Sequence, residues 1–161
     1  MTGRGADPEI DVMRESTLWP KDDSEAVVRH AIVACADHAP PLSEVSIVLT
    51  DDAHIKALNA QYRGKDAATN VLSFPVTTGS AGAPRLLGDI VIAYETTARE
   101  AEREGKSLAH HLAHLTVHGF LHLLGYDHES EAEAETMERL ERDILARLDI
   151  PDPYDTRDTE A

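Results

Sequence analysis

With 161 residues, of which 42% are hydrophobic, the chain is long enough to bury one core and too short to require a second domain. Its formal net charge of −15 excludes a broadly basic surface that binds any nucleic acid without discrimination. No run of about 18 apolar residues could span a bilayer, and residues 1–9 lack the apolar segment of a secretory signal. We therefore expect a cytoplasmic protein without membrane contact.

The first half of the chain predicts strands and helices in alternation. Apolar and polar residues partly alternate over 9–16, which indicates an edge strand, and helical spacing follows within 22–39. The β-branched residues of 44–50 predict a second strand. A short helix is expected within 51–64, where an aspartate caps one end and a glycine ends the other.

The second half predicts two further strands and then only helices. Strands are expected at 69–75 and 86–94, on either side of a loop rich in Gly, Ser, Thr and Pro. The three helices are expected at 95–104, 107–124 and 130–148, the last opening with a capping box. This order predicts a small α/β (α+β) domain, in which helices cover a sheet of about four strands.

We expect one domain over residues 9–150, flanked by a flexible tail at 1–8 and an acidic tail at 151–161 that frays. The negative charge is uneven, because residues 129–161 carry 12 acidic and 4 basic side chains. The preceding part of the chain is only mildly acidic. It could still form a local cationic cleft, for which the candidates are Arg63, Lys65 and Arg85.

The most informative stretch is HGFLHLLGYDH, which begins at His118. A helix advances about 400° in four residues, so His118 and His122 lie on one face roughly 6 Å apart. Gly125 then ends the helix and allows a sharp turn that returns His128 toward the pair. This helix is apolar around nearly its whole circumference and is expected to be central.

Three protein ligands with a fourth position left open are typical of a catalytic zinc site. Zinc lowers the pKa of a water to about 7, which supplies a nucleophile without a serine or cysteine. We predict one zinc ion per chain, bound by His118, His122 and His128, and we count His118 among the catalytic residues.

Two alternatives remain open on spacing alone. Individual histidines can fill polar gaps in a core, and His114 with His118 forms an equally good pair four residues apart. Only the later pair is followed by the glycine and the returning histidine. We interpret His114 as structural or as a residue that orients a ligand. Asp127 either orients a ligand imidazole or forms the turn.

The spacing H-x-x-x-H-x-x-G-x-x-H is that of the metzincin proteases, with one difference. Gly119 stands where those proteases carry the glutamate that acts as general base. General base catalysis is typically worth about 10²- to 10⁴-fold in rate. A metzincin-like metallopeptidase is therefore only an alternative.

Three further motifs accompany the histidine stretch: LNAQYRGKDAATNVLSFP at 58–75, LLGDIVIA at 86–93 and DPY at 152–154. With them, most of residues 44–154 resembles the YbeY family of bacterial endoribonucleases and ribosomal RNA maturation factors. The resemblance implies a zinc-dependent endoribonuclease, specific for single strands, that acts in small-subunit ribosomal RNA processing, ribosome quality control and late ribosome maturation.

The resemblance also implies a role for Arg63, which matches the family's functional arginine, and it implies partners. These are single-stranded ribosomal RNA, the small ribosomal subunit and its proteins, with no DNA expected. An arginine can bridge two charged phosphate oxygens in a transition state, although an ion pair or solvation is the more common role. Lys65, Asn70 and Ser73 are candidates for substrate binding, while the two polar strand residues could equally serve the fold.

A competing hypothesis is a ribosome assembly factor whose metal is structural and whose nuclease activity is weak or absent. The acidic helix at 130–148 favours it, because such a helix could contact basic ribosomal proteins.

Overall fold

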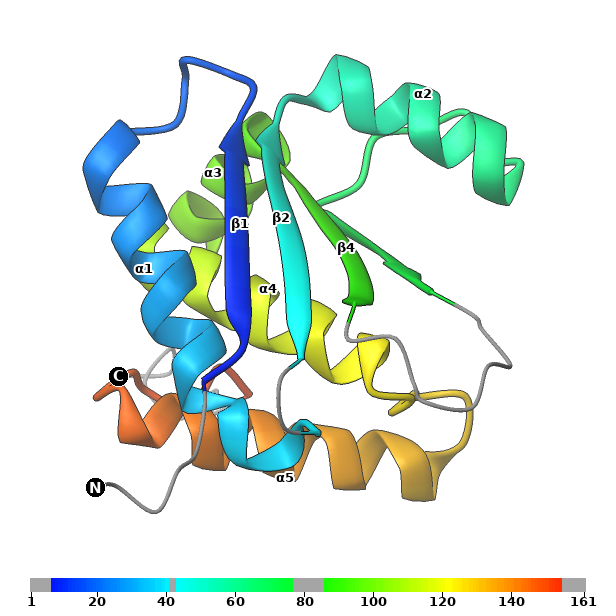
Figure 1. Cartoon of the computed structure of the whole chain (residues 1–161). Helices are drawn as coiled ribbons and strands as arrows, with labels where there is room; N and C mark the ends of the chain where they lie inside the picture. The colour runs from blue at the N-terminus through cyan, green and yellow to red at the C-terminus, as the bar shows by residue number, and fades with distance from the viewer. Residues whose placement is uncertain (1–6, 41–42, 77–85, 155–161) are drawn as a thin grey trace.

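The computed structural model describes residues 7–40, 43–76 and 86–154, and it confirms the predicted order of elements (Figure 1). The strands are β1 (Glu9–Arg14), β2 (Glu44–Thr50), β3 (Val71–Pro75) and β4 (Leu86–Ala93). The helices are α1 (Lys21–Ala34), α2 (Asp52–Arg63), α3 (Tyr94–Glu104), α4 (Leu108–Leu123) and α5 (Glu131–Arg147), with a short 3₁₀ helix at Ala36–His38. None of the described helices is long and apolar enough to cross a membrane.

The four strands form one mixed sheet in the order β1-β2-β4-β3. The first three run parallel, so that Val12 lies opposite Ile47 and Ile47 opposite Ile90. Strand β3 pairs antiparallel with β4 and occupies one edge of the sheet. The predicted class, an α/β domain with about four strands, is thus confirmed.

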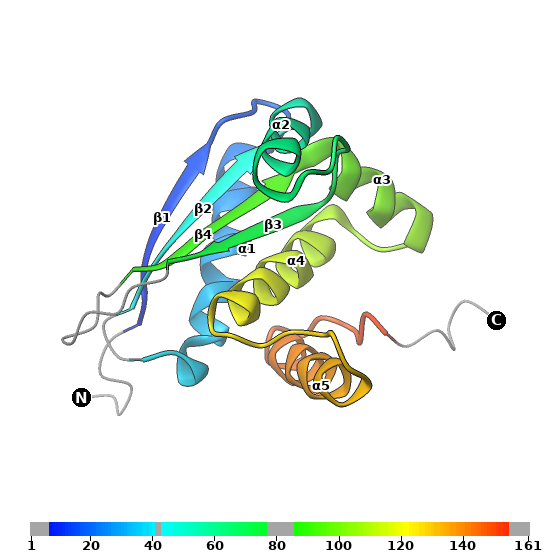
Figure 2. The ribbon, with the colours of Figure 1, turned by 90° about the vertical axis from the view of Figure 1, so that its right-hand side faces the viewer.

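The two faces of the sheet carry separate hydrophobic clusters. In β4, Ile90 and Ile92 point into the main core with α1, α4 and α5, whereas Val91 points to the opposite face. There it packs with Leu72 of β3 and Ile55 of α2. Figure 2 shows the result: α2 lies on one side of the sheet, and α1, α4 and α5 lie on the other.

Helix α4 is the central helix, as the sequence predicts. Ser107 caps it by accepting a hydrogen bond of 3.0 Å from the backbone N–H of His110. Leu112, Phe120 and Leu121 are fully buried or nearly so. Each such side chain contributes about 1.5–3 kcal/mol through burial. The histidines of α4 are therefore carried by one of the most firmly packed parts of the molecule.

Helix α5 begins with the predicted capping box. The Ser130 hydroxyl accepts from the backbone N–H of Glu133, whose carboxylate accepts from the backbone N–H of Ser130. The buried residues of α5 are Met137, Glu141, Ile144 and Leu145. A carboxylate thus belongs to the face that α5 packs against α4.

Three predicted boundaries were wrong by two residues or more, and one of them is the strand expected at 69–75, which begins at Val71. The helix expected within 22–39 ends at Ala34, because the N–H of Cys35 bonds back to Ile32 and starts a separate 3₁₀ turn. The strand expected at 9–16 ends at Arg14. The backbone N–H groups of Glu15 and Ser16 both donate to the carbonyl of Leu49, so the regular pairing of the strand stops there.

Candidate metal centre

Three histidine side chains converge at the C-terminal end of α4. The Nε2 atoms of His118 and His122 lie 3.1 Å apart. The ring of His128 lies 5.7 Å from that of His118 and 5.1 Å from that of His122, measured between centroids. One nitrogen of each ring lies within 4.8 Å of the other two. The structure therefore brings together the three residues predicted as metal ligands.

The turn after α4 delivers the third histidine. Gly125 has a φ of +104°, which is a backbone conformation that favours glycine. The N–H of Tyr126 bonds to the carbonyl of Leu121 at 3.1 Å and fastens the turn. Asp127 accepts a hydrogen bond of 2.8 Å from the backbone N–H of His128. The carboxylate of Asp127 thus binds the backbone of the turn, and no hydrogen bond joins it to an imidazole among the described residues.

Glu141 of α5 lies behind the histidines and is fully buried. Its Oε2 accepts a hydrogen bond of 2.6 Å from Nδ1 of His118, and its Oε1 accepts one of 2.9 Å from Nε2 of His114. Burial alone would raise the pKa of Glu141, but the hydrogen bonds from His114 and His118 outweigh it and lower this pKa to about 2. Glu141 is therefore an ionised acceptor in the interior.

The C-terminal segment also reaches this carboxylate. The hydroxyl of Tyr154 donates a hydrogen bond of 2.5 Å to Oε1 of Glu141. Burial, and secondly this bond to an anion, raise the pKa of Tyr154 well above its ordinary value, so the phenol keeps its proton. The expected fraying after residue 150 is therefore wrong for Tyr154, because a buried acceptor holds its side chain.

The donor set fits a metal ion. Burial lowers the pKa of His122, and the neighbouring His118 and His128 lower it further, so this imidazole stays neutral as a ligand must. Two nitrogens on one tetrahedral zinc lie about 3.3 Å apart, given Zn–N bonds of about 2.0–2.1 Å. The separation of 3.1 Å between the Nε2 atoms of His118 and His122 is close to that value.

A second group of ligand-type atoms shares His118 with the first. It consists of His114, His118 and Glu141, whose potential ligand atoms also lie within 4.8 Å of one another. Its contacts of 2.6 Å and 2.9 Å are hydrogen-bond distances, and the hydroxyl of Tyr154 takes part in the same network. We therefore interpret the second group as a hydrogen-bonded support.

The structure does not bring the predicted basic residues into the histidine cluster. Arg63 is the last residue of α2, and Lys65 follows it closely; both are exposed. Helix α2 packs on the sheet face opposite to α4. No hydrogen bond or ion pair joins the side chain of Arg63 to another described residue, and Arg85 lies outside the described residues.

Asn70, which lies just before β3, and Ser73 of β3 both have partners within the fold. The side-chain amide of Asn70 donates to Glu100 of α3 at 2.9 Å, and Glu100 also bonds His111 at 2.8 Å. The hydroxyl of Ser73 donates to the carbonyl of Gly119 in α4 at 3.1 Å. Ser73 thus lies beside the histidine helix, whereas Asn70 faces α3.

Gly119 is required by packing. A Cβ added there would lie 2.9 Å from a methyl group of Ile90 and 3.1 Å from the hydroxyl of Ser73. Helix α4 thus approaches the sheet too closely for a larger residue. The glutamate that metzincin proteases carry at this position would displace the sheet, which weakens the peptidase alternative.

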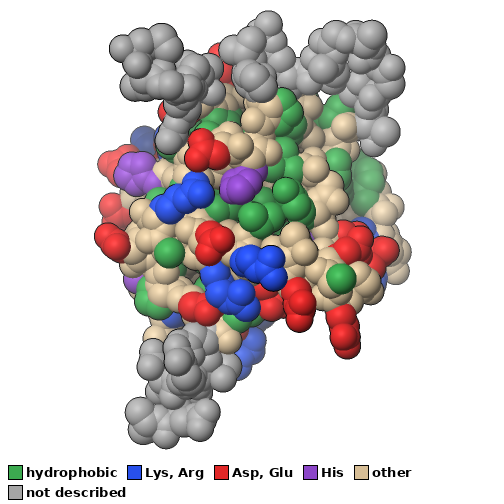
Figure 3. All heavy atoms as spheres, turned by 90° about the horizontal axis from the view of Figure 1, so that it is seen from below, with side chains coloured by type: hydrophobic (Ala, Val, Ile, Leu, Met, Phe, Trp, Pro, Cys, Tyr) green, Lys and Arg blue, Asp and Glu red, His purple; other side chains and the backbone are tan. Residues whose placement is uncertain are grey.

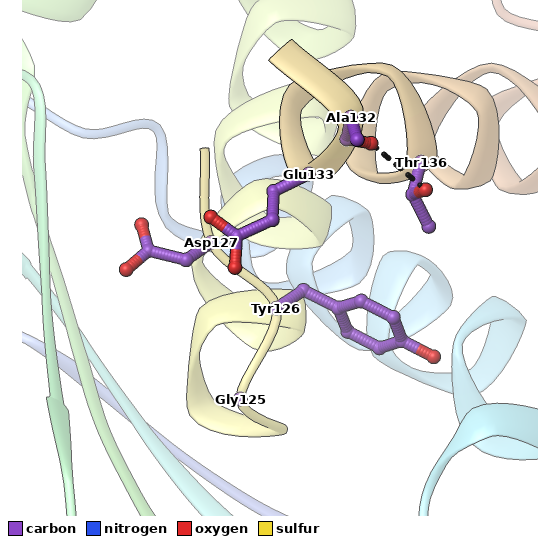
Figure 4. Close-up of a pocket in the computed structure, with 6 residues that line it drawn as sticks. All are labelled: Gly125, Tyr126, Asp127, Ala132, Glu133 and Thr136. Carbon is purple, nitrogen blue, oxygen red and sulfur yellow. Dashed lines mark hydrogen bonds between the residues drawn. The ribbon is translucent and has the colours of Figure 1, made fainter. Parts of the chain in front are cut away.

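A shallow pocket of about 250 Å³ borders the turn that carries His128 (Figure 4). Its lining consists of Gly125, Tyr126, Asp127, Ala132, Glu133 and Thr136. Two carboxylates make this pocket unfavourable for a phosphate. Seen from below in Figure 3, acidic, basic, histidine and hydrophobic side chains are interspersed, so this face shows no continuous basic surface.

Sequence reasoning missed Glu141 and Tyr154 as parts of the centre. Glu141 could have been noticed, because it follows Met137 by four residues and precedes Ile144 and Leu145, which places a carboxylate in the apolar stripe of α5. Tyr154 belongs to the motif DPY. No local periodicity indicates that it folds back to α5.

The comparisons agree on one family. A family model described as Endoribonuclease YbeY matches residues 9–149. The chain is 54% identical over 159 residues to Endoribonuclease YbeY of Rhodopseudomonas palustris (strain BisA53), covering 94% of this chain and 92% of that protein. It is 53% identical over 160 residues to Endoribonuclease YbeY of Bradyrhizobium sp. (strain BTAi1), covering 94% and 95%.

A solved structure shares the fold. The solution structure of TM1509 from Thermotoga maritima aligns with a TM-score of 0.57 at 23% identity, covering 91% of this chain and 99% of that one. At this identity the likeness supports the architecture alone.

Proposed function

The chain belongs to the YbeY endoribonuclease family, and on that premise we propose that it is a metal-dependent endoribonuclease that cleaves single-stranded RNA. Its proposed role is the processing of small-subunit ribosomal RNA in the cytoplasm, in ribosome maturation and quality control. The observation that carries the proposal is the convergence of three imidazole nitrogens within 4.8 Å.

The proposed cofactor is one zinc ion per chain, held by His118, His122 and His128. A set of three neutral imidazoles suits zinc better than the harder ions magnesium and calcium, which prefer oxygen. With its fourth position open, zinc supplies a Lewis acid and lowers the pKa of a water to about 7. Glu141 supports this assignment, because its hydrogen bond leaves the other nitrogen of His118 free of a proton.

Arg63 is the proposed transition-state residue. Its planar guanidinium can donate two parallel hydrogen bonds to the oxygens of a phosphodiester as negative charge gathers on them. The support from the structure is that Arg63 is exposed and its guanidinium has no polar partner among the described residues, so its donors are available to substrate.

Helix α2 and the two residues that follow it are the proposed contact surface for RNA. Residues 53–65 include Lys56, Arg63 and Lys65 and no acidic residue, in a chain of net charge −15. Tyr62 is 61% exposed, and its ring is held edge to face against Phe74 at 5.4 Å between centroids. Aromatic rings beside basic side chains bind single-stranded nucleic acid by stacking and charge, without requiring a particular sequence.

The acidic residues of helix α5 favour a protein partner in addition to RNA. Glu131, Glu133, Glu135 and Asp143 are all exposed on it. We propose that this surface contacts basic proteins of the small ribosomal subunit. An assembly factor with a structural metal would use the same surface, so the two functions are separated by the cleavage reaction itself.

The test compares zinc-loaded wild type, His118→Ala and Arg63→Ala on a single-stranded RNA and on a duplex of the same sequence. We expect wild type to cut only the single strand. His118→Ala should lose both metal and cleavage, and Arg63→Ala should keep the metal and lose cleavage. Folded, zinc-loaded wild type that binds ribosomal subunits and cuts no RNA would favour the assembly factor instead.

A further inference from the structure

We infer that Glu141 is a positioning residue of the proposed metal centre, held in place by Tyr154 and His114. In this role its carboxylate fixes the tautomer and orientation of His118, so that Nε2 of that ring faces the other two histidines. The inference rests on the proposed function, since it concerns the same centre.

The burial of Glu141 indicates a specific role. It has no exposed surface, and it shares its face of α5 with Met137, Ile144 and Leu145. Burying a leucine stabilises the fold, whereas burying a carboxylate of similar size destabilises it unless the charge is fully hydrogen-bonded. Packing of α5 on α4 alone would be better served by an apolar residue. The interactions of the carboxylate therefore need another explanation.

The geometry at His118 supplies one. Nδ1 of this ring lies 2.6 Å from Oε2 of Glu141, and Nε2 lies 3.1 Å from Nε2 of His122. A carboxylate can only accept, so the proton of a neutral His118 resides on Nδ1 and a lone pair on Nε2. That lone pair faces the point where the three imidazoles converge. Residues that orient a ligand in this way typically change metal affinity by about 10- to 100-fold.

Tyr154 and His114 occupy the other oxygen of the carboxylate. Oε1 accepts from the Tyr154 hydroxyl at 2.5 Å and from Nε2 of His114 at 2.9 Å. With one oxygen bound to His118 and the other shared by these two donors, Glu141 is prevented from turning toward the metal itself. The carboxylate therefore acts on the centre only through His118.

The segment before Tyr154 is fastened close by. Asp152 forms an ion pair with Arg142 of α5 at 3.2 Å and accepts a hydrogen bond from the backbone N–H of Tyr154 at 2.8 Å. The guanidinium of Arg142 also lies 5.9 Å from the centre of the Tyr154 ring. These contacts hold the tyrosine over Glu141, so residues 152–154 belong to the support of the centre.

The experiment measures zinc affinity by competition with a chromophoric chelator, and the tautomer of His118 by ¹H–¹⁵N NMR of the metal-free protein. The variants are Glu141→Gln and Tyr154→Phe. The matched control is Glu102→Gln on α3, whose side chain is exposed and forms no hydrogen bond or ion pair within the described part of the chain. Thermal unfolding checks the fold of each variant.

We expect Glu141→Gln to weaken zinc binding by about 10- to 100-fold and to convert His118 into a mixture of tautomers. Tyr154→Phe, which removes one hydroxyl, should weaken zinc binding by a smaller factor and leave the fold intact. Glu102→Gln should match wild type in both measurements.

Unchanged zinc affinity and an unchanged tautomer in folded Glu141→Gln would overturn the inference. If that variant does not fold, wild-type zinc affinity in Tyr154→Phe would overturn the support assigned to the tail. Two zinc ions per wild-type chain, one of them lost in Glu141→Gln, would make Glu141 a ligand. Weakened zinc binding in a protein that cuts no RNA would support the inference and contradict the proposed function alone.

Discussion

The hydroxyl of Ser73 donates a hydrogen bond of 3.1 Å to the carbonyl of Gly119, which joins edge strand β3 to the helix one residue after His118. Ile90 also lies against Gly119, so that a side chain added at residue 119 would press on Ile90 and Ser73. The close approach of α4 to the sheet therefore determines the position of His118.

Gly119→Ala tests this approach. Alanine in a helix interior is normally favoured over glycine by about 1 kcal/mol. Here its methyl group would press on Ile90 and Ser73, and overpacking of this kind costs about 1–3 kcal/mol. We expect the free energy of unfolding, measured by urea denaturation, to fall by about 1 kcal/mol. A rise in stability would show that helix and sheet lie further apart than the structure places them.

His122→Ala tests the ligand set. Removal of one imidazole from three leaves too few nitrogens to hold the ion, so we expect zinc content, measured by mass spectrometry after dialysis, to fall from one per chain to near zero. The matched control is His110→Ala, about three turns earlier on α4, which should retain zinc. Full retention by His122→Ala would contradict the assignment.

The buried His111 predicts a dependence of stability on pH. Burial lowers its pKa despite the opposing hydrogen bond to Glu100, and its Nδ1 has no hydrogen-bond partner within the part of the chain that the structure describes. Below about pH 6.5, residue His111 is protonated in the unfolded chain and stays neutral in the folded protein. The free energy of unfolding therefore decreases as pH falls through this range.

We therefore expect the metal-free protein to lose stability between pH 7.5 and 5.5. For one full proton the slope approaches about 1.4 kcal/mol per pH unit. His111→Gln, which keeps a donor for Glu100, should show a shallower slope in urea denaturation across this range. Identical slopes in the two proteins would exclude His111 as the source.

Tyr62→Ala tests the proposed RNA surface. Stacking of a base on an aromatic ring contributes about 1–3 kcal/mol, so loss of the ring should raise KM for single-stranded RNA roughly tenfold and change kcat little. Tyr62→Phe keeps the ring and should behave as wild type. Equal KM values for the alanine variant and wild type would show that Tyr62 is not part of the RNA-contact surface.

Lys65→Ala separates charge from chemistry. If Lys65 neutralises one phosphate, its loss should reduce the slope of log affinity against log salt by about 0.7, with no change in kcat. Filter binding at several salt concentrations measures the slope. Lys21→Ala, an exposed lysine at the start of α1, is the control and should leave the slope unchanged.

Much of the fold follows from local chemistry. The start of α5 is predictable because Ser130 and Glu133 are spaced as a capping box, and the end of α2 because Gly64 follows it with a φ of +70°. The antiparallel pairing of β3 and β4 could also be predicted from the sequence. The ten residues between Pro75 and Leu86 are fewer than a parallel crossover requires.

The histidine cluster was predictable for the same reason, since helical period and one glycine determine where His118, His122 and His128 lie. The hydrogen-bond partners that come from other helices and segments could not be predicted in this way. Asn70 donates to Glu100, and Glu141 accepts from Tyr154, only because tertiary packing brings α3 and the C-terminal segment to them. Arg63 shows the same limit: its motif is local, but its place relative to the histidines depends on which sheet face α2 covers.

The separation of Arg63 and the histidines by the sheet has a consequence for the shape of the substrate. An RNA strand that contacts both α2 and the histidines has to bend around an edge of the sheet, because the two lie on opposite sheet faces. An unpaired strand rotates freely about its backbone bonds and can make that bend. A double helix resists it, since DNA duplexes stay stiff over about 150 base pairs. Discrimination against paired RNA would then arise from this bend around the sheet, without any contact that reads base pairing.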